Sequence, residues 1–143
     1  MNQAVIATAA EIIQDEAKKE QGGGFCTLAL IDENGYPTAS TVSISKANSI
    51  KELTFCAGLS GNKAKRIQKC NRASVCFNSS NYNITLVGTV EILTDPEAKK
   101  ESWYTGCEHH WSGIDDPDFC VLRFTTERYN LFVGPEDFAE GIL

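Results

Sequence analysis

Many short strand-like runs separated by tight turns predict a mainly β protein, an antiparallel β-barrel of the split, Greek-key type with helices at its edges. Three observations carry this prediction. About seven short apolar or alternating runs recur along the 143 residues. Most successive runs are joined by turns too short for parallel crossovers. Three further segments have helical spacing or helix-start residues.

The predicted elements follow this pattern along the chain. Residues 3–19 carry apolar side chains at 3.6-residue spacing, which predicts an amphipathic helix that ends in the Gln-Gly-Gly-Gly stretch at 21–24. An Asn-Gly step within 32–37 favours a hairpin turn. Further helices are predicted at 61–70 and from Thr94, and an irregular stretch at 103–118. Strands are predicted at 25–32, 38–45, 52–57, 74–79, 82–93, 119–127 and 129–133.

Length and composition indicate one cytoplasmic domain spanning residues 1–143. Hydrophobic residues make up 42% and charged residues 22%, as in ordinary globular proteins. The N-terminal stretch lacks the features of a signal peptide, and no apolar run approaches the roughly 20 residues of a membrane helix. Six cysteines form no CxxC pair, and four of them lie in strand-like runs, so we expect free thiols in a reducing compartment.

Charge is distributed unevenly along the chain. The net charge is −6, yet residues 53–90 contain no acid, and five basic residues fall between Lys63 and Arg72. That segment is therefore +5, which leaves −11 for the rest. The overall charge disfavours nucleic acid and anionic membranes as partners. The basic segment also contains no aromatic residue for stacking on single-stranded bases. A small anionic ligand suits this local charge better.

The stretch GLSGNK at 58–63 is the candidate anion site. It lacks the spacing of a P-loop. We expect Ser60 to cap the following helix, leaving backbone N–H groups through Lys63 to meet an anion, with the Lys63 ammonium as a point charge. The alternative is a solvated helix with an ordinary basic face.

Metal binding and hydrolysis are not predicted. Cys107, Glu108, His109 and His110 are adjacent, and no second arm completes a four-ligand site. The sequence contains no GxSxG motif. Trp111, in the same loop, is expected either to pack against the core or to cover a bound ring.

Four stretches together resemble the pyridoxamine 5′-phosphate oxidase-like FMN-binding split barrels, a family that includes small general stress proteins. They are DENGYPTASTV, FCAGLSGNKAKRI, CNRASVCF and NITLVGTVEILTD, in this order. The resemblance runs from Cys26 to Leu93 and more weakly to Val133. It implies FMN as cofactor, a split barrel, and a homodimer with FMN at its interface.

The resemblance also implies site residues. The strand along the flavin matches Ser40, Thr41, Val42 and Ser43, where Ser40 replaces an arginine that often contacts the phosphate. The strand end beside the ring matches Cys56 and Ala57, and the phosphate site matches Ser60, Asn62 and Lys63. Asn83 matches a polar residue that reaches the flavin, and Phe132 an aromatic residue from the partner subunit.

These inferences predict an FMN-dependent oxidoreductase of unknown substrate. The alternative is a stress-related protein that binds flavin, haem or a deazaflavin without turnover. We expect Arg66, three positions past Lys63 on the helix, to compensate for the arginine missing at Ser40. The C-terminal GPEDFAEGIL has no basic residue to hold a substrate phosphate, so true pyridoxamine phosphate oxidase activity is not expected.

Overall fold

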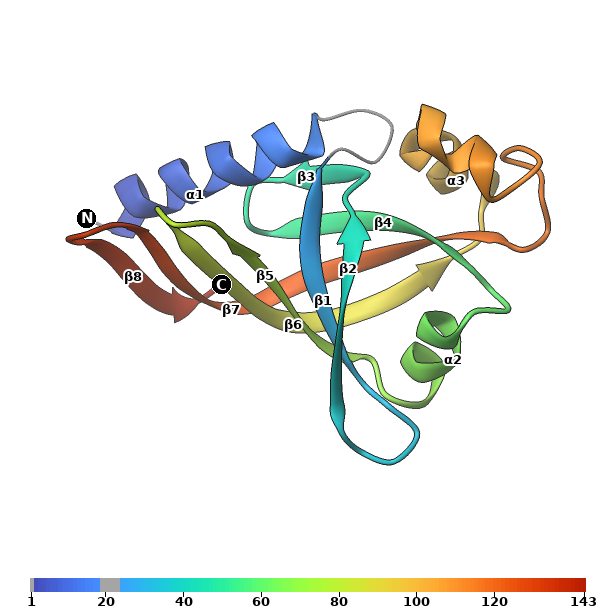
Figure 1. The fold of residues 1–143 in the computed structure, drawn as a ribbon, viewed down its shortest axis with the longest axis horizontal. Coiled ribbons are helices and arrows are strands. Elements are labelled where there is room, and N and C mark those ends of the chain that lie inside the picture. The colour runs from blue at the N-terminus through green and yellow to red at the C-terminus, as the bar shows by residue number, and fades with distance from the viewer. Residues whose placement is uncertain (1, 19–23) are drawn as a thin grey trace.

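The computed structural model describes residues 2–18 and 24–143 and contains a curled antiparallel sheet with helices at its edges (Figure 1). The strand order is β2-β1-β5-β6-β7-β4-β3, and β8 pairs with β7. The strands are β1 (Phe25–Ile31), β2 (Pro37–Ser43), β3 (Lys46–Asn48), β4 (Glu52–Gly58), β5 (Arg72–Asn78), β6 (Asn83–Leu93), β7 (Phe119–Gly134) and β8 (Asp137–Ile142). This arrangement confirms the predicted split-barrel class.

The sheet curls because its two edge strands are consecutive in the chain. Only Ile44 and Ser45 separate β2 from β3, so the two edges must lie close together. The Ser45 N–H donates to the Thr54 carbonyl of β4 at 2.8 Å across this gap. No strand pairing joins β2 to β4 among the described residues. We call this unpaired junction between the end of β2 and β4 the seam.

Four helical segments flank the sheet: α1 (Asn2–Ala17), α2 (Asn62–Lys69), α3 (Pro96–Ser102) and the 3-10 helix η1 (Thr105–His109). The first three match the predicted helices, while η1 lies in the stretch predicted to be irregular. The glycines predicted to end α1 lie mostly in 19–23, outside the described residues. No helix in 2–18 or 24–143 has both the length and the apolar composition needed to span a membrane.

The core lies inside the curl and is built by alternating side chains. In β1, β4, β5 and β6 every second residue is buried, as with Leu28, Phe55, Val75 and Leu86. Helix α1 adds its own buried face to the same cluster, with Ile13 fully buried. Burying each such large side chain contributes about 1.5–3 kcal/mol. The face of β4 that carries Thr54, Cys56 and Gly58 therefore points away from the core.

Strand β7 is continuous, so the predicted break near Arg128 is wrong. Its first half pairs with β4 and its second half with β8, while β6 pairs along both halves through a bulge at Val87 and Gly88. A Cβ atom on Gly88 would lie 1.9 Å from the Thr125 carbonyl oxygen, so only glycine fits this close approach. Strands β3 and β8 were not predicted, because their polar residues lack an apolar alternation.

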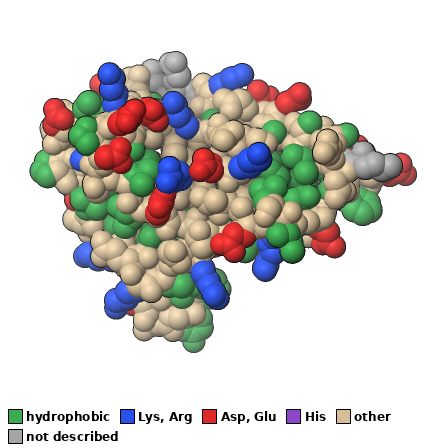
Figure 2. Space-filling view, turned by 180° about the vertical axis from the view of Figure 1, so that it is seen from behind, with side chains coloured by type: hydrophobic (Ala, Val, Ile, Leu, Met, Phe, Trp, Pro, Cys, Tyr) green, Lys and Arg blue, Asp and Glu red, His purple; other side chains and the backbone are tan. Residues whose placement is uncertain are grey.

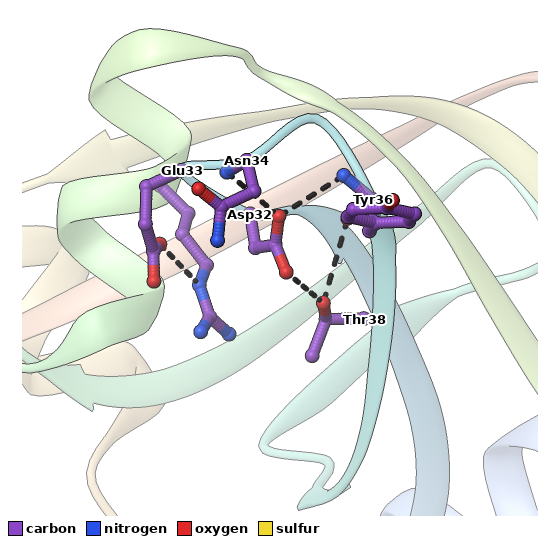
Figure 3. Close-up of polar contacts among 6 residues, drawn as sticks. Asp32, Glu33, Asn34, Tyr36 and Thr38 are labelled. Carbon is purple, nitrogen blue, oxygen red and sulfur yellow. Dashed lines mark hydrogen bonds and ion pairs between the residues drawn. The ribbon is translucent and has the colours of Figure 1, made fainter.

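The β1–β2 hairpin has the predicted tight turn (Figure 3). The Asp32 carboxylate accepts hydrogen bonds from the N–H groups of Asn34 at 2.9 Å and Tyr36 at 3.0 Å, and from the Thr38 hydroxyl at 2.9 Å. These bonds hold the pKa of Asp32 below its usual value. Gly35 adopts φ +85°, the left-handed conformation that an Asn-Gly turn requires.

Candidate functional site

The seam brings together two of the predicted cofactor-binding residues, Ser43 and Cys56. Both contact the segment between α3 and η1. Ser43 lies near the Tyr104 hydroxyl, and the Cys56 thiol donates to the Ser102 carbonyl at 3.2 Å. Ser45 also donates a short hydrogen bond to that carbonyl. The segment 102–107 therefore ties β2 to β4 at a point where the strands themselves do not pair.

Two thiols are neighbours beneath this segment. The Cys107 thiol neighbours Cys56 and is fully buried in η1. The polar Cys56 side chain lowers the pKa of Cys107 to about 7 despite its burial, whereas Cys107 and burial raise the pKa of Cys56 strongly. Because only one thiolate of such a pair is stabilised by the remaining thiol, the first proton is lost more easily than from an isolated buried thiol and the second is held more tightly.

The first turn of α2 differs from the predicted one. The helix begins at Asn62 with Gly61 as its N-cap and without a side-chain cap, so the prediction that Ser60 caps it is wrong. The Ser60 N–H instead donates to Asp118 Oδ1 at 2.8 Å, and the Leu59 N–H donates to the Asp118 carbonyl at 2.7 Å. The N–H groups of Asn62 and Lys63, in the first turn, have no acceptor within the helix.

Lys63 and Arg66 have different electrostatic surroundings. Arg66 Nε lies 3.2 Å from Glu33 Oε2 in the β1–β2 turn, and the guanidinium lowers the pKa of that carboxyl. Figure 3 shows Glu33 pointing away from the hydrogen bonds of Asp32. Lys63, by contrast, has no ion-pair partner in the described part of the chain. Lys63 is therefore an uncompensated positive charge in the first turn of α2, whereas the proposed phosphate contact of Arg66 stays a prediction.

Trp111 and Asp118 line the end of β4, close to Gly58. A Cβ atom on Gly58 would lie 2.7 Å from Asp118 Oδ2 and 3.7 Å from Trp111 Nε1. Trp111 also packs on Phe119 with ring centroids 5.0 Å apart, and the Trp103 ring centroid lies 5.1 Å from that of Phe119. Trp111 is thus a packing residue whose indole edge borders the turn that leads into α2.

Sequence reasoning did not identify Asp118 as part of this region. Its signal is positional: Asp118 immediately precedes Phe119, the first residue of β7, which lies opposite Gly58 at the end of β4. Predicting that Asp118 lies near Gly58 requires knowing that β7 pairs with β4, and no local sequence pattern indicates this pairing.

The predicted residues of β2 and the end of β4 face different ways. Ser40 and Thr41 are exposed on the edge strand β2, and Val42 packs partly against the core. Ala57 is buried in the core, opposite Cys120. A ligand at the seam can therefore meet the side chain of Cys56, but only the backbone of Ala57.

Asn83 and Phe132 lie far from Cys56 along β7. They are directly opposite each other in the β6–β7 pairing, whereas Cys56 is opposite Val121, eleven residues earlier in β7. Eleven strand residues correspond to about 36 Å of strand. The Asn83 amide oxygen accepts a hydrogen bond from Cys76, and Phe132 is 41% exposed. One chain therefore brings Asn83 and Phe132 together, but not next to Lys63.

The predicted residues divide among separate clefts. Thr41 lines a cleft of about 300 Å³. Asn62 and Arg66 line a second cleft of about 350 Å³, and Phe132 lines a third of about 570 Å³. A further cleft of about 600 Å³ beside α3 contains none of them. Figure 2 shows acidic and basic side chains gathered near α3. Within the described residues, no group of three or more His, Cys, Asp or Glu side chains could hold a metal ion.

Comparison with known proteins identifies the family. The family model described as pyridoxamine 5′-phosphate oxidase matches residues 13–132, most of the chain. The chain belongs to the pyridoxamine 5′-phosphate oxidase family. This membership confirms the resemblance seen in the sequence, and the match covers the seam, α2 and the Asn83–Phe132 pair. No curated protein matches the sequence.

Solved structures of other proteins share the fold. A Clostridium acetobutylicum protein related to general stress protein 26 of B. subtilis is 26% identical, with a TM-score of 0.82 over 100% of this chain and 97% of that chain. An FMN-binding protein of Nostoc punctiforme is 18% identical, with a TM-score of 0.65 over 96% and 87%. A haem-binding protein of Mycobacterium smegmatis is 20% identical, with a TM-score of 0.70 over 94% and 57%.

Proposed function

We propose that this protein binds FMN at the interface of a homodimer and is an FMN-dependent oxidoreductase. The observation that carries the proposal is the position of Lys63. Its unpaired ammonium stands at the first turn of α2, five residues after β4 ends beside the seam, within a family match that spans this whole region. The FMN-binding relative from Nostoc punctiforme supports the choice of cofactor. We place the protein in the cytoplasm, where its six cysteines would stay reduced.

The first turn of α2 fits a phosphate. Two N–H groups, of Asn62 and Lys63, lack acceptors in the helix, and the helix dipole favours an anion there. The Lys63 ammonium adds a charge-assisted contact. The Asp118 carboxylate opposes phosphate binding on the Ser60 side of the turn. It carries a negative charge there and already accepts a hydrogen bond from the Ser60 N–H at 2.8 Å. We therefore expect the phosphate on the Asn62–Lys63 side of the turn, away from Asp118.

The isoalloxazine ring requires cover that one chain does not supply. The seam offers Ser43 and Cys56 on one side of the proposed ring position. The polar and aromatic residues expected on the other side, Asn83 and Phe132, lie at the opposite end of β7. We therefore propose that a second copy supplies both. Exposed Phe132 lies opposite exposed Phe138 of β8, which leaves an apolar surface for such a contact. Figure 2 shows hydrophobic side chains gathered toward the β7–β8 end of the molecule.

The chain's own part is to bind and orient the cofactor. FMN supplies the redox chemistry when it is bound. Lys63 and the α2 N–H groups would hold the phosphate, the seam would position the ring, and Trp111 would limit water at the end of β4. Among the described residues of the seam, the ionisable side chain with a pKa near neutrality is Cys107.

The alternative function is binding of flavin or haem without turnover. The haem-binding protein of Mycobacterium smegmatis, which has the same fold, supports haem as the alternative cofactor. Haem iron needs an axial side-chain ligand, and exposed His109 and His110 lie on and beside η1. The absorbance spectrum of the purified protein distinguishes haem from flavin. Oxidation of NADH or NADPH by the flavin-loaded protein distinguishes turnover from storage.

Binding of FMN and riboflavin by the ligand-free protein tests the proposal. We expect tighter binding of FMN, because only FMN carries the phosphate. Lys63→Ala should weaken FMN binding by about 1.5–3 kcal/mol, roughly tenfold to 150-fold, and leave riboflavin nearly unchanged. Lys65→Ala, two positions away and on another face of α2, is the matched control. Equal affinity for the two flavins would show that the phosphate site is wrong.

Two further measurements test the finer parts of the proposal. Sedimentation at micromolar concentration should find a dimer when FMN is bound, and a flavin-loaded monomer would contradict the shared site. Arg66→Ala tests whether Arg66 leaves Glu33 to help bind the phosphate. An FMN loss in Arg66→Ala that is absent in Lys65→Ala would support its role, and small equal losses in both would mean that Lys63 and the backbone act alone.

A further inference from the structure

A row of four side chains crosses the outward face of the sheet beside α3. Lys46 of β3 lies opposite Thr54 of β4. Arg123 of β7 lies opposite Thr54 on one side and Glu91 of β6 on the other. Residues that are directly opposite in an antiparallel sheet project from the same face. Thr54 is on the face of β4 that points away from the core, so the whole row lies on that face.

Helix α3 covers the adjacent row of the same face. This second row contains Cys56, Val121 and Leu93, which lie opposite one another in β4, β7 and β6. Val121 is fully buried although it is on the outward face, and the Cys56 thiol donates to the Ser102 carbonyl of α3 at 3.2 Å. The first row, apart from Glu91, is therefore the floor of the cleft of about 600 Å³, and α3 is one of its walls.

Two buried polar atoms of the floor lack a hydrogen-bond partner in the described part of the chain. They are Thr54 Oγ1 and Arg123 Nε, and their residues are directly opposite each other. Arg123 Nη2 bonds Glu91, which leaves the Nε edge of the guanidinium without an acceptor. Unpaired buried polar atoms are costly, and the guanidinium can only donate. An anionic oxygen beside Arg123 would satisfy it, and the positive charge of Lys46 in the same row favours such an anion.

The α3 wall carries the opposite charge. Glu97 and Glu101 line the cleft from positions i and i+4 of α3, which share one face of a helix. Neither forms an ion pair with another described residue. Glu52 and Asp95 are two further acids of the cleft, and Asp95 is engaged as the N-cap of α3. Because these four acids face only the two bases of the floor, a ligand with positive as well as negative charge suits the cleft (Figure 2).

We propose that this cleft binds a small zwitterion, an α-amino acid with an apolar side chain. The carboxylate binds Arg123 above Thr54, and the ammonium binds Glu97 and Glu101. Leu93 supplies apolar surface between them. The volume of about 600 Å³ is typical of small-molecule sites. A dianionic phosphate is disfavoured by the surrounding acids. None of the residues assigned to FMN lines this cleft, so the site is additional to the proposed flavin site.

Leucine and two analogues with one charge each test the proposal. Isocaproate lacks the ammonium of leucine, and isoamylamine lacks its carboxylate. Each compound is titrated into the isotope-labelled protein while the backbone amide signals are followed by NMR. We expect leucine to shift the signals of residues 46–48, 54 and 97–102 and to bind roughly tenfold more tightly than either analogue. Equal affinity for the three compounds, or unshifted signals at high millimolar leucine, would overturn the proposal.

Variants separate the two charged contacts. Arg123→Gln should weaken binding of leucine and isocaproate roughly tenfold and leave isoamylamine unchanged. Glu97→Gln combined with Glu101→Gln should weaken leucine and isoamylamine instead and leave isocaproate unchanged. Glu127→Gln, which removes an exposed acid of β7 outside the cleft, is the matched control and should change none of the three affinities.

The wild-type comparison of the three compounds decides the outcome if a variant does not fold. An equal loss for all three compounds in Arg123→Gln would contradict the assigned carboxylate contact. Shifts of the same signals that follow protein concentration rather than leucine would assign the cleft to a second copy of the chain and overturn the proposal. No measurement here requires flavin, so its result is independent of whether FMN binds.

Discussion

Ser60 donates a 2.8 Å hydrogen bond from its backbone N–H to the carboxylate of Asp118, a residue 58 positions later in the chain. This bond places a negative charge beside the turn that leads into α2, next to the proposed phosphate position. The carboxylate holds the loop in place, but it also repels an anion bound at Lys63. Asp118 is therefore expected to limit the affinity for FMN.

Asp118→Asn should increase the affinity for FMN about fivefold. The asparagine oxygen can still accept from Ser60, while the repulsion between two nearby, partly screened negative charges, about 1 kcal/mol, is removed. Riboflavin binding should not change. Fluorescence titration measures the affinities for FMN and riboflavin. Asp115→Asn is the control for the loss of one exposed negative charge. An equal gain for both flavins would contradict the electrostatic explanation.

Mixed dimers should show that Lys63 and Phe132 of one flavin site come from different chains. A Lys63→Ala chain paired with a Phe132→Ala chain would have one intact site and one doubly altered site. We expect one tightly bound FMN per mixed dimer, whereas each variant homodimer binds its two FMN molecules roughly tenfold or more weakly. FMN stoichiometry of affinity-tagged mixed dimers measures this. No tight site in the mixed dimer would mean that one chain supplies both residues.

Gly88→Ala should destabilise the fold by about 2–3 kcal/mol. The added Cβ would lie 1.9 Å from the Thr125 carbonyl oxygen, so β6 and β7 must separate at their bulge. Gly113→Ala is the matched control, because no heavy atom lies within 4 Å of its Cβ position. Urea unfolding of both variants gives the two changes in free energy. Similar stability in the two variants would show that the bulge adjusts without cost.

Local patterns predict much of this fold. Alternating side chains predict the core strands, because one face of each must be buried, and the Asn-Gly step predicts the turn that Asp32 and Gly35 form. The basic composition of α2 likewise indicates where an anion would bind. Strands β3 and β8 escape such prediction because pairing with β4 and β7, rather than an apolar pattern, makes them strands.

Tertiary structure alone decides which of these residues meet. The curl of the sheet brings Ser45 and Cys56 to the same carbonyl, that of Ser102, because β2 and β3 are consecutive in the chain but lie at opposite edges of the sheet. The β4–β7 register brings Asp118 to Ser60, and the β6–β7 register places Asn83 opposite Phe132, far from Lys63. Side-chain periodicity is a local property, whereas register and closure depend on hydrogen bonds between residues distant in the chain.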